Sequence, residues 1–268
     1  MNILLLVISA LNLALAFNHN LIHDVSISGA SLIASKLALD NMKTLSLNQN
    51  TTRKLVHITA APAFISTWQF YDSKYIAASV PILASLYLVK NSSSLSDIIS
   101  RSGNKNEIFK GPLIYTIVLS LITLTYWKED PIGLIAMTQL SIGDGFADII
   151  GRKYGNNKWE FNKKKSVEGT IGFLASSSLF TYFLLNNLDI FENIHSYSFI
   201  EIFIISSTCS FTELFSKIDD NLSIPLTAIF INYFLLVHRY VNFIDPIINS
   251  VAADYFSNII HTGHIHLP

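Results

Sequence analysis

Long apolar runs, five of them without any charged side chain, alternate with short charged segments along most of the chain. The runs cover residues 25–39, 55–71, 75–89, 111–127, 131–150, 169–188, 199–216 and 221–238, with a partial ninth run over 246–260. Several approach the roughly 20 residues that a helix needs to cross a bilayer, and they leave almost no polar helix face. We therefore predict an all-α fold, a polytopic integral membrane helical bundle of about seven to nine transmembrane helices. A soluble all-helical core is the alternative.

The first seventeen residues form a separate apolar stretch. They contain no charged side chain and end in small residues around Ala16, which resembles the apolar core and cleavage site of a secretory signal peptide. The basic start of such peptides is missing, so a short extra membrane helix is the alternative. We expect residues 1–17 to be a signal or targeting segment and residues 18–268 to form a single transmembrane domain.

Composition supports a membrane protein and excludes several other classes. Charged residues make up 14% of the chain, against roughly a quarter in soluble domains. Half of the residues are hydrophobic, which excludes a disordered chain. The formal net charge of -1 provides no basic field, so we expect no nucleic-acid partner. Cys209 is the only cysteine in the sequence, which excludes an internal disulfide framework and a zinc site built from cysteines.

The basic residues are unevenly distributed between the two sides of the predicted bundle. If the runs cross a membrane in alternation, fourteen of the 18 Lys and Arg residues fall on one side. These are Lys43, Arg53, Lys54, Lys90, Arg101, Lys105, Lys110, Arg152, Lys153, Lys158, Lys163, Lys164, Lys165 and Lys217. By the positive-inside rule, that side faces the cytosol, or the stroma of a plastid.

A glycine-rich segment contains two acids inside an otherwise apolar run. Asp144 and Asp148 are four residues apart, so their carboxylates lie on one face of the expected helix. Carboxylates at membrane depth are costly and usually mark a functional site. Gly143 and Gly145 flank the first acid and allow a backbone or ligand to approach closely. The structural alternative is that both acids simply lie at the end of a helix, where the basic residues that follow neutralise them.

A basic loop follows and ends where the next apolar run begins. It contains Lys158, Lys163, Lys164 and Lys165, and leads through Glu168 into the run. The start of a helix favours an anion because of its free amides and its dipole. Acids and cations facing one another suit a magnesium-bound polyphosphate, since Mg²⁺ takes one or two carboxylates plus phosphate oxygens. Contact with anionic lipids is the alternative for such a loop.

Two further polar clusters belong to the same predicted side of the membrane. They are Arg53, Lys54 and His57 at one run, and Glu213, Asp219 and Asp220 at another. Helix capping would explain some of these residues individually. It does not explain so many carboxylates on an otherwise basic side, so we expect the clusters to share one site.

These clusters resemble the motifs of the polyprenol kinase family, which includes phytol, farnesol and dolichol kinases, with phytol kinase the most similar. The resemblance covers residues 53–225 and rests on Arg53-Lys54-x-x-His57, Gly143-Asp144-Gly145-x-Ala147-Asp148-x-x-Gly151-Arg152, Lys165-Ser166-x-Glu168-Gly169, and Glu213 with Asp219-Asp220. Members of this family are integral membrane enzymes that transfer a phosphate from CTP, or another nucleoside triphosphate, to an isoprenoid alcohol. The resemblance thus implies a single transmembrane kinase domain.

The resemblance also implies roles for individual residues. The expected Mg²⁺ ligands are Asp144, Asp148 and Glu213. The expected contacts to CTP are Arg53, Lys54, Gly143, Gly145, Arg152, Lys163, Lys164, Lys165 and Glu168, with Glu168 orienting either Lys165 or the nucleotide. The expected catalytic residues are His57, Asp148, Asp219 and Asp220. His57 would position the hydroxyl group or a phosphate, and Asp219 or Asp220 would hold a second metal or accept the alcohol proton.

Two other functions remain as alternatives. A phosphatidate cytidylyltransferase-like enzyme also uses CTP in a membrane, and its basic loop is similar to Lys164-Lys165-Ser166-x-Glu168-Gly169. The C-terminal signature of that family is missing here. A membrane transporter would use the intramembrane acids as ion ligands. It predicts acids at mid-membrane and inverted repeats, whereas the acids here belong to one side and no repeat is visible.

The resemblance also suggests a location and a set of partners. Phytol kinases usually act in chloroplast membranes, so we expect an integral protein of a plastid membrane, with the ER membrane as the alternative. The expected partners are a nucleoside triphosphate, an isoprenoid alcohol and membrane lipid.

Overall fold

The computed structural model describes residues 19–44, 48–100, 102–128, 130–188, 190–191 and 197–237. The expected targeting segment, residues 1–17, and the partial ninth run, residues 246–260, lie outside these residues. The chain divides into two units, one ending at Ile229 and the other beginning at Phe230. The packing and the site described below belong to the first unit.

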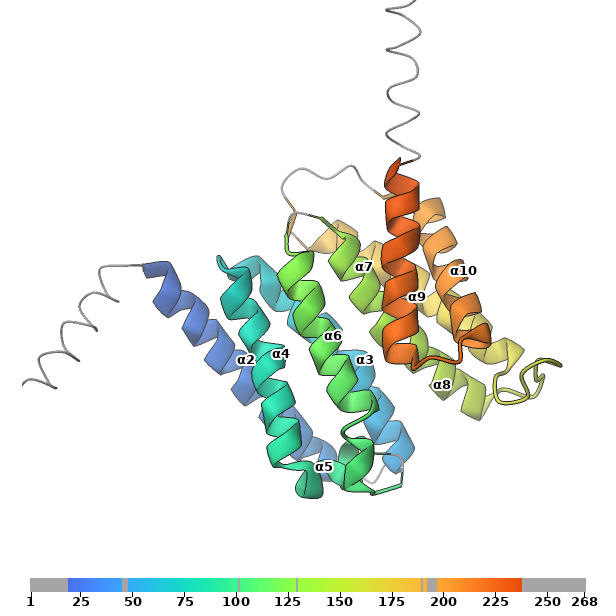
Figure 1. The fold of residues 1–268 in the computed structure, drawn as a ribbon, viewed down its shortest axis with the longest axis horizontal. Helices are drawn as coiled ribbons and strands as arrows, with labels where there is room; N and C mark the ends of the chain where they lie inside the picture. Colours follow the sequence, from blue (N-terminus) through green and yellow to red (C-terminus); the bar gives the residue numbers. More distant parts are fainter. Residues whose placement is uncertain are drawn as a thin grey trace, which may run out of the picture. The chain divides into compact units, whose positions relative to one another are not determined.

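Regular structure in the described residues is helical (Figure 1). The helices are α2 (His19–Thr44), α3 (Gln49–Thr67), α4 (Lys74–Lys90), α5 (Ser92–Ile99), α6 (Gly111–Thr125), α7 (Ile132–Thr138), α8 (Asp144–Lys153), α9 (Val167–Asn187) and α10 (Phe199–Phe215), followed by a last helix, Asp220–Val237. β pairing within these residues is limited to one isolated bridge between Lys158 and Ser166. The prediction of an all-α fold is confirmed.

The helix that contains α7 and α8 forms the centre of the first unit. Every residue from 131 to 145 is buried, because this segment packs against α3, α6, α9 and α10. On one side of it, α2, α4 and α6 lie side by side (Figure 1). The central position explains why this apolar run carries Asp144 in the interior rather than on a solvated face.

A π-helical turn, Gln139–Gly143, joins α7 to α8. In an α-helix the amide of Asp144 would donate to the carbonyl oxygen of Leu140, four residues back. Here it donates to the carbonyl oxygen of Gln139, five residues back. The Leu140 carbonyl oxygen is thereby available to another donor, and π turns of this kind are frequent at functional sites.

Side-chain caps define where the helices that carry the polar clusters begin. Asn48 accepts a hydrogen bond from the Thr51 amide before α3, and Ser166 accepts one from the Gly169 amide before α9. A reciprocal capping box between Ser198 and Glu201 opens α10. Because these caps satisfy amides that have no partner inside the helix, they fix the loops that lead into each helix.

The structure also contains elements that the apolar runs did not predict. Helix α5 is a short, serine-containing helix that follows α4 almost directly, and its Leu95, Ile98 and Ile99 pack against Leu88 and Ile108 in a small core cluster. Helix α2 begins several residues before the run that predicted it. Neither feature is visible in a search for long charge-free segments, because one is too short and the other starts with polar residues.

Within the part of the chain that the structure describes, two helical stretches are long and apolar enough to cross a membrane, Lys105–Thr125 and Asp220–Val237. The remaining helices fall short of that standard by length or by composition. A bundle with about seven to nine transmembrane helices therefore stays a prediction.

Candidate active site

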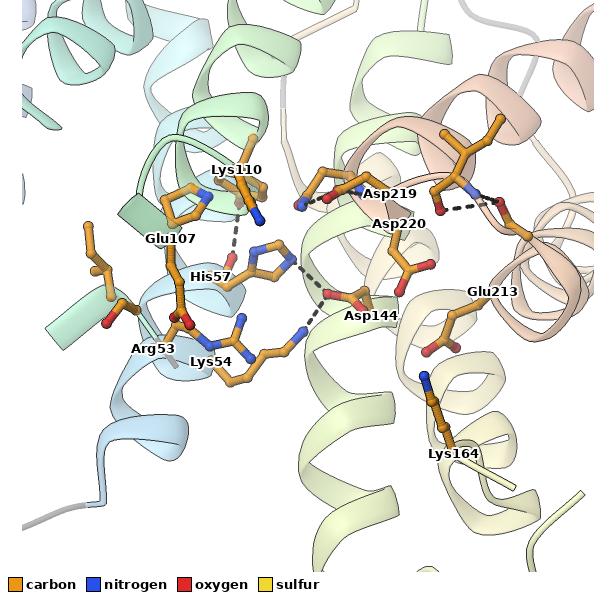
Figure 2. Close-up of a pocket in the computed structure, with 18 of the residues that line it drawn as sticks. Arg53, Lys54, His57, Glu107, Lys110, Asp144, Lys164, Glu213, Asp219 and Asp220 are labelled. Carbon is orange, nitrogen blue, oxygen red and sulfur yellow. Dashed lines mark hydrogen bonds and ion pairs between the residues drawn. The ribbon is translucent and has the colours of Figure 1, made fainter. Parts of the chain in front are cut away.

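A cavity of about 1100 Å³ opens between α3, the start of α6, the loop before α9 and the turn that follows α10. Most of the polar residues singled out from the sequence line it. They are Arg53, Lys54, His57, Asp144, Lys163, Lys164, Lys165, Glu213, Asp219 and Asp220. The clusters expected to share one site therefore do meet in the fold. Figure 2 shows labelled side chains from each cluster around the cavity, among them Lys54, Asp144, Lys164, Glu213 and Asp220.

Three carboxylates form the acid triad of the cavity. Asp144 comes from the first residue of α8, Glu213 from the last turn of α10, and Asp220 from the first residue of the last helix. One oxygen from each lies within 4.8 Å of the other two. Asp144 and Glu213 are buried and Asp220 is partly buried. An all-oxygen donor set of this size matches what Mg²⁺ prefers.

Asp144 is held by two partners from α3, as Figure 2 shows. The Lys54 ammonium group donates to the Asp144 carboxylate at 2.5 Å, and His57 Nε2 lies 3.2 Å from the same oxygen. Both Lys54 and Asp144 are buried. Because a buried carboxylate without a partner is costly, these contacts are what permit Asp144 to sit inside the bundle.

The contacts of His57 fix the orientation of its ring and place a proton on its Nε2 atom. Its Nε2 lies 3.0 Å from the Leu140 carbonyl oxygen that the π turn makes available, besides its contact to Asp144. Both of these partners are acceptors, so Nε2 carries a proton. The Tyr115 ring lies 4.4 Å from the imidazole between centroids, and its hydroxyl donates to the His57 carbonyl oxygen at 2.9 Å. The sequence analysis missed Tyr115, which is an unremarkable aromatic residue within an apolar run.

Lys165 is paired with the other two members of the acid triad. Its ammonium group lies 2.5 Å from Glu213 and 3.3 Å from Asp220. Burial lowers the pKa of Lys165, but the two carboxylates outweigh that effect and the pKa is raised above its usual value. Lys165 therefore stays positively charged beside the acids over the whole physiological pH range.

Glu168 stabilises the loop before α9 and does not line the cavity. Its carboxylate accepts hydrogen bonds from the Asn157 amide at 3.1 Å and from the Asn157 side chain at 2.8 Å. The loop is also closed by the Lys158–Ser166 bridge. The sequence suggested that Glu168 orients Lys165 or the nucleotide. In the structure it accepts hydrogen bonds from Asn157, so it acts on the loop that carries Lys165.

Asp148 lies outside the acid triad, one helical turn beyond Asp144. It accepts a hydrogen bond from Arg152 Nε at 2.9 Å, and a terminal nitrogen of Arg53 lies 3.8 Å from its other oxygen. Arg53 itself lines the cavity. The sequence placed the two aspartates together as metal ligands, whereas the structure groups Asp144 with Glu213 and Asp220, and Asp148 with arginines.

Gly143 and Gly145 lie at helix contacts and do not line the cavity. A Cβ atom at Gly143 would come within 2.6 Å of the Phe173 ring on α9, and one at Gly145 within 2.1 Å of Ile58 on α3. The close approach that the sequence indicated is therefore present, but between helices. It brings α3, with Lys54 and His57, against the helix that carries Asp144.

The chain is similar to several curated plant proteins along most of its length. It is 32% identical over 247 residues to "Phytol kinase 1, chloroplastic" of Arabidopsis thaliana, which covers 84% of this chain and 80% of that protein. It is 34% identical over 210 residues to "Probable phytol kinase 1, chloroplastic" of Glycine max, which covers 72% and 69%. For "Probable phytol kinase, chloroplastic" of Zea mays the identity is 32% over 207 residues, which covers 70% and 68%. No family model and no solved structure matches the chain.

Proposed function

Because the chain belongs to the phytol kinase family, we propose that it transfers the γ-phosphate of a nucleoside triphosphate, with CTP as the expected donor, to the hydroxyl group of an isoprenoid alcohol. Phytol is the first candidate for the acceptor, and farnesol and geranylgeraniol are the next. The relatives carry phytol kinase in their names, and the residues of the cavity support the same reaction class.

The observation that carries this proposal is the acid triad facing a ring of cations in one cavity. The carboxylates of Asp144, Glu213 and Asp220 lie within 4.8 Å of one another. Arg53, Lys163 and Lys164 line the same space, together with other basic side chains. A magnesium-bound polyphosphate needs this combination, because its metal is bound by carboxylates and its remaining negative charge by basic groups. The volume of about 1100 Å³ is sufficient for a nucleoside triphosphate.

Each group in the cavity has a proposed role. The acid triad holds Mg²⁺, which when bound neutralises charge on the phosphate oxygens. Lys163 and Lys164 bind phosphate oxygens, and Arg53 does so in the orientation that Asp148 gives it. These groups bind the substrate and the transition state by electrostatics, which is the largest contribution in phosphoryl transfer.

The alcohol also needs a group that accepts its proton as the new O–P bond forms. Asp220 is the triad member with the most exposed side chain, at 34%, and we assign this role to it. The Nε2 proton of His57 is directed at the Leu140 carbonyl oxygen and the Asp144 carboxylate, so His57 positions Asp144 beside the hydroxyl or phosphate. Asp219 lines the cavity, but its carboxylate accepts hydrogen bonds from the Asn221 amide and side chain at 2.9 and 2.7 Å. It therefore holds the turn that presents Asp220.

A membrane location fits both the acceptor and the surface of the protein. Large apolar side chains are exposed on α4, α9 and α10, among them Leu86 at 61%, Leu179 at 62% and Ile200 at 70%. Such a surface is typical of a protein that contacts lipid. An isoprenoid chain can remain in the bilayer while its hydroxyl group reaches the cavity, which supplies proximity to the phosphate. From the chloroplastic relatives we propose a plastid membrane, with the ER membrane as the alternative.

One assay tests this proposal directly. Protein purified in detergent is incubated with Mg²⁺, γ-labelled CTP and, separately, phytol, farnesol, geranylgeraniol or phosphatidate. Label should enter a lipid alcohol phosphate and should be lost in Asp144→Asn protein. Absence of label in every alcohol product, with ATP and UTP as well as CTP, would contradict the proposal. Transfer of α-label from CTP into phosphatidate would identify a cytidylyltransferase instead.

A further inference from the structure

An exposed aromatic stack stands at the rim of the cavity. The rings of Phe161 and Phe215 are nearly parallel, at an angle of 8°, with their centroids 4.8 Å apart. Trp159 contacts the same Phe161 ring with a centroid distance of 5.4 Å. Phe161 is 56% exposed and Phe215 is 63% exposed. A stack of this kind presents a flat apolar surface close to the charged lining groups Lys163, Lys164 and Lys165.

The loop that carries Phe161 is fixed in position. The Trp159 indole donates to the Thr170 hydroxyl at 3.0 Å, on the first turns of α9. The Asn162 side-chain amide donates to the Leu214 carbonyl oxygen at 2.9 Å, near the end of α10. These contacts tie the loop to two helices, one on each side of Phe161. The ring is therefore presented by a rigid support and does not need to be ordered when a ligand binds, which favours affinity.

Phe161 lines the same cavity as the acid triad and directly precedes the basic residues of the loop. Lys163, Lys164 and Lys165 follow it within four positions, and all of them line the cavity. A group that binds next to Phe161 is thus close to the residues that would hold phosphates. The aromatic face and the cations together match a molecule with a flat ring at one end and several negative charges at the other.

We propose that Phe161 stacks against the base of the donor nucleotide and that Phe215 supports its ring from behind. This inference rests on the proposed function and adds the recognition of the nucleoside part. Every nucleobase has a π face that stacks on an aromatic side chain. Phe161 therefore distinguishes a nucleoside triphosphate from the bare polyphosphate chain.

Comparison of two ligands separates base binding from phosphate binding. Affinities for CTP and for inorganic tripolyphosphate are measured by calorimetry with Mg²⁺ and full-length protein in detergent. Phe161→Leu should weaken the binding of CTP by about tenfold and leave the binding of tripolyphosphate unchanged. Phe161→Tyr, which keeps a ring, should bind CTP nearly as the wild type does. The matched control is Phe183→Leu, because Phe183 is 55% exposed and does not line the cavity.

The outcomes distinguish this inference from the proposed function. Unchanged CTP binding in Phe161→Leu protein, or an equal loss for both ligands, would overturn the stacking role while leaving the kinase proposal intact. A wild-type protein that binds neither ligand would overturn both. If Phe161→Leu lowers the association of the protein with liposomes but not its affinity for CTP, the stack is an interfacial membrane anchor, and the stacking role is again wrong.

Discussion

Lys165 and Glu213 are 48 residues apart in the sequence, yet the ammonium group lies 2.5 Å from the carboxylate. Asp220 contacts the same ammonium group at 3.3 Å. Two of the three proposed metal ligands thus share their charge with Lys165. A divalent cation and Lys165 compete for these oxygens, because each positive charge repels the other when both lie beside the same carboxylates.

This competition leads to a prediction for Lys165→Met. Without the ammonium group, the triad should bind Mn²⁺ about tenfold more tightly in the absence of nucleotide, a change of roughly 1.4 kcal/mol. The turnover of CTP should fall, because a phosphate-binding cation is lost. Manganese binding can be followed by electron paramagnetic resonance. Lys163→Met is the control, since Lys163 lines the cavity but the lysines that form salt bridges with the triad are Lys54 and Lys165. An equal gain in Mn²⁺ affinity in both variants would contradict this competition, because it would show that removing any positive charge from the cavity has the same effect.

Asp144 and Lys54 offer a second prediction, on stability. Asp144→Asn leaves the buried Lys54 ammonium group without its carboxylate, which should lower the free energy of unfolding by about 3–5 kcal/mol. Combining Asp144→Asn with Lys54→Met should recover much of that loss, because no unpaired buried charge remains. Activity should stay at least about 100-fold reduced in both variants, since the proposed metal ligand is missing.

Thermal unfolding in detergent and γ-phosphate transfer measure the two effects separately. Recovery of stability without recovery of activity is the expected result for a residue with both roles. Recovery of activity in the double variant would show that Asp144 matters only for folding.

Most helices could be predicted because the sequence repeats one simple pattern. A helix surrounded by apolar neighbours or by lipid must be apolar on all sides, so a charge-free run marks it directly. The π turn between Gln139 and Gly143 leaves no such mark. It depends on a partner for the Leu140 carbonyl oxygen, which is His57, 83 residues away in the sequence. The local periodicity of a sequence gives no information on contacts between residues so far apart along the chain.

The composition of the site was predictable, but the grouping of its acids was not. Helical spacing pairs Asp144 with Asp148, and that inference is sound for residues of one helix. The structure adds partners from other helices: Lys54 and His57 approach Asp144, while Arg53 approaches Asp148. Burial also differs, because Asp144 faces the centre and Asp148 is nearer the helix end. The position of each acid on the helix, and the helices that pack around it, therefore decide which acid joins the triad.

The separation of these two acids gives a third prediction. Asp148→Asn should weaken the binding of tripolyphosphate, because Arg53 and Arg152 lose the carboxylate that orients them. Its affinity for Mn²⁺ should stay within about twofold of the wild type, since a metal ligand is not removed. Asp144→Asn should show the reverse pattern. A loss of Mn²⁺ binding in Asp148→Asn protein would instead support Asp148 as a metal ligand, the role expected from the sequence.

Gly145 and Ile58 provide the last prediction, which concerns the contact between α3 and α8. In Gly145→Ala the new methyl group would lie 2.1 Å from an Ile58 side-chain carbon, so the Ile58 side chain or the two helices must shift. We expect the free energy of unfolding to fall by about 1–3 kcal/mol, and activity to fall with it, because α3 carries Lys54 and His57. Ile58→Ala in the same chain creates room for the methyl group. The double variant should therefore be more stable than the sum of the two single effects predicts. Thermal unfolding and tripolyphosphate binding measure the result. If Gly145→Ala keeps its stability but binds nucleotide poorly, Gly145 contacts the nucleotide itself.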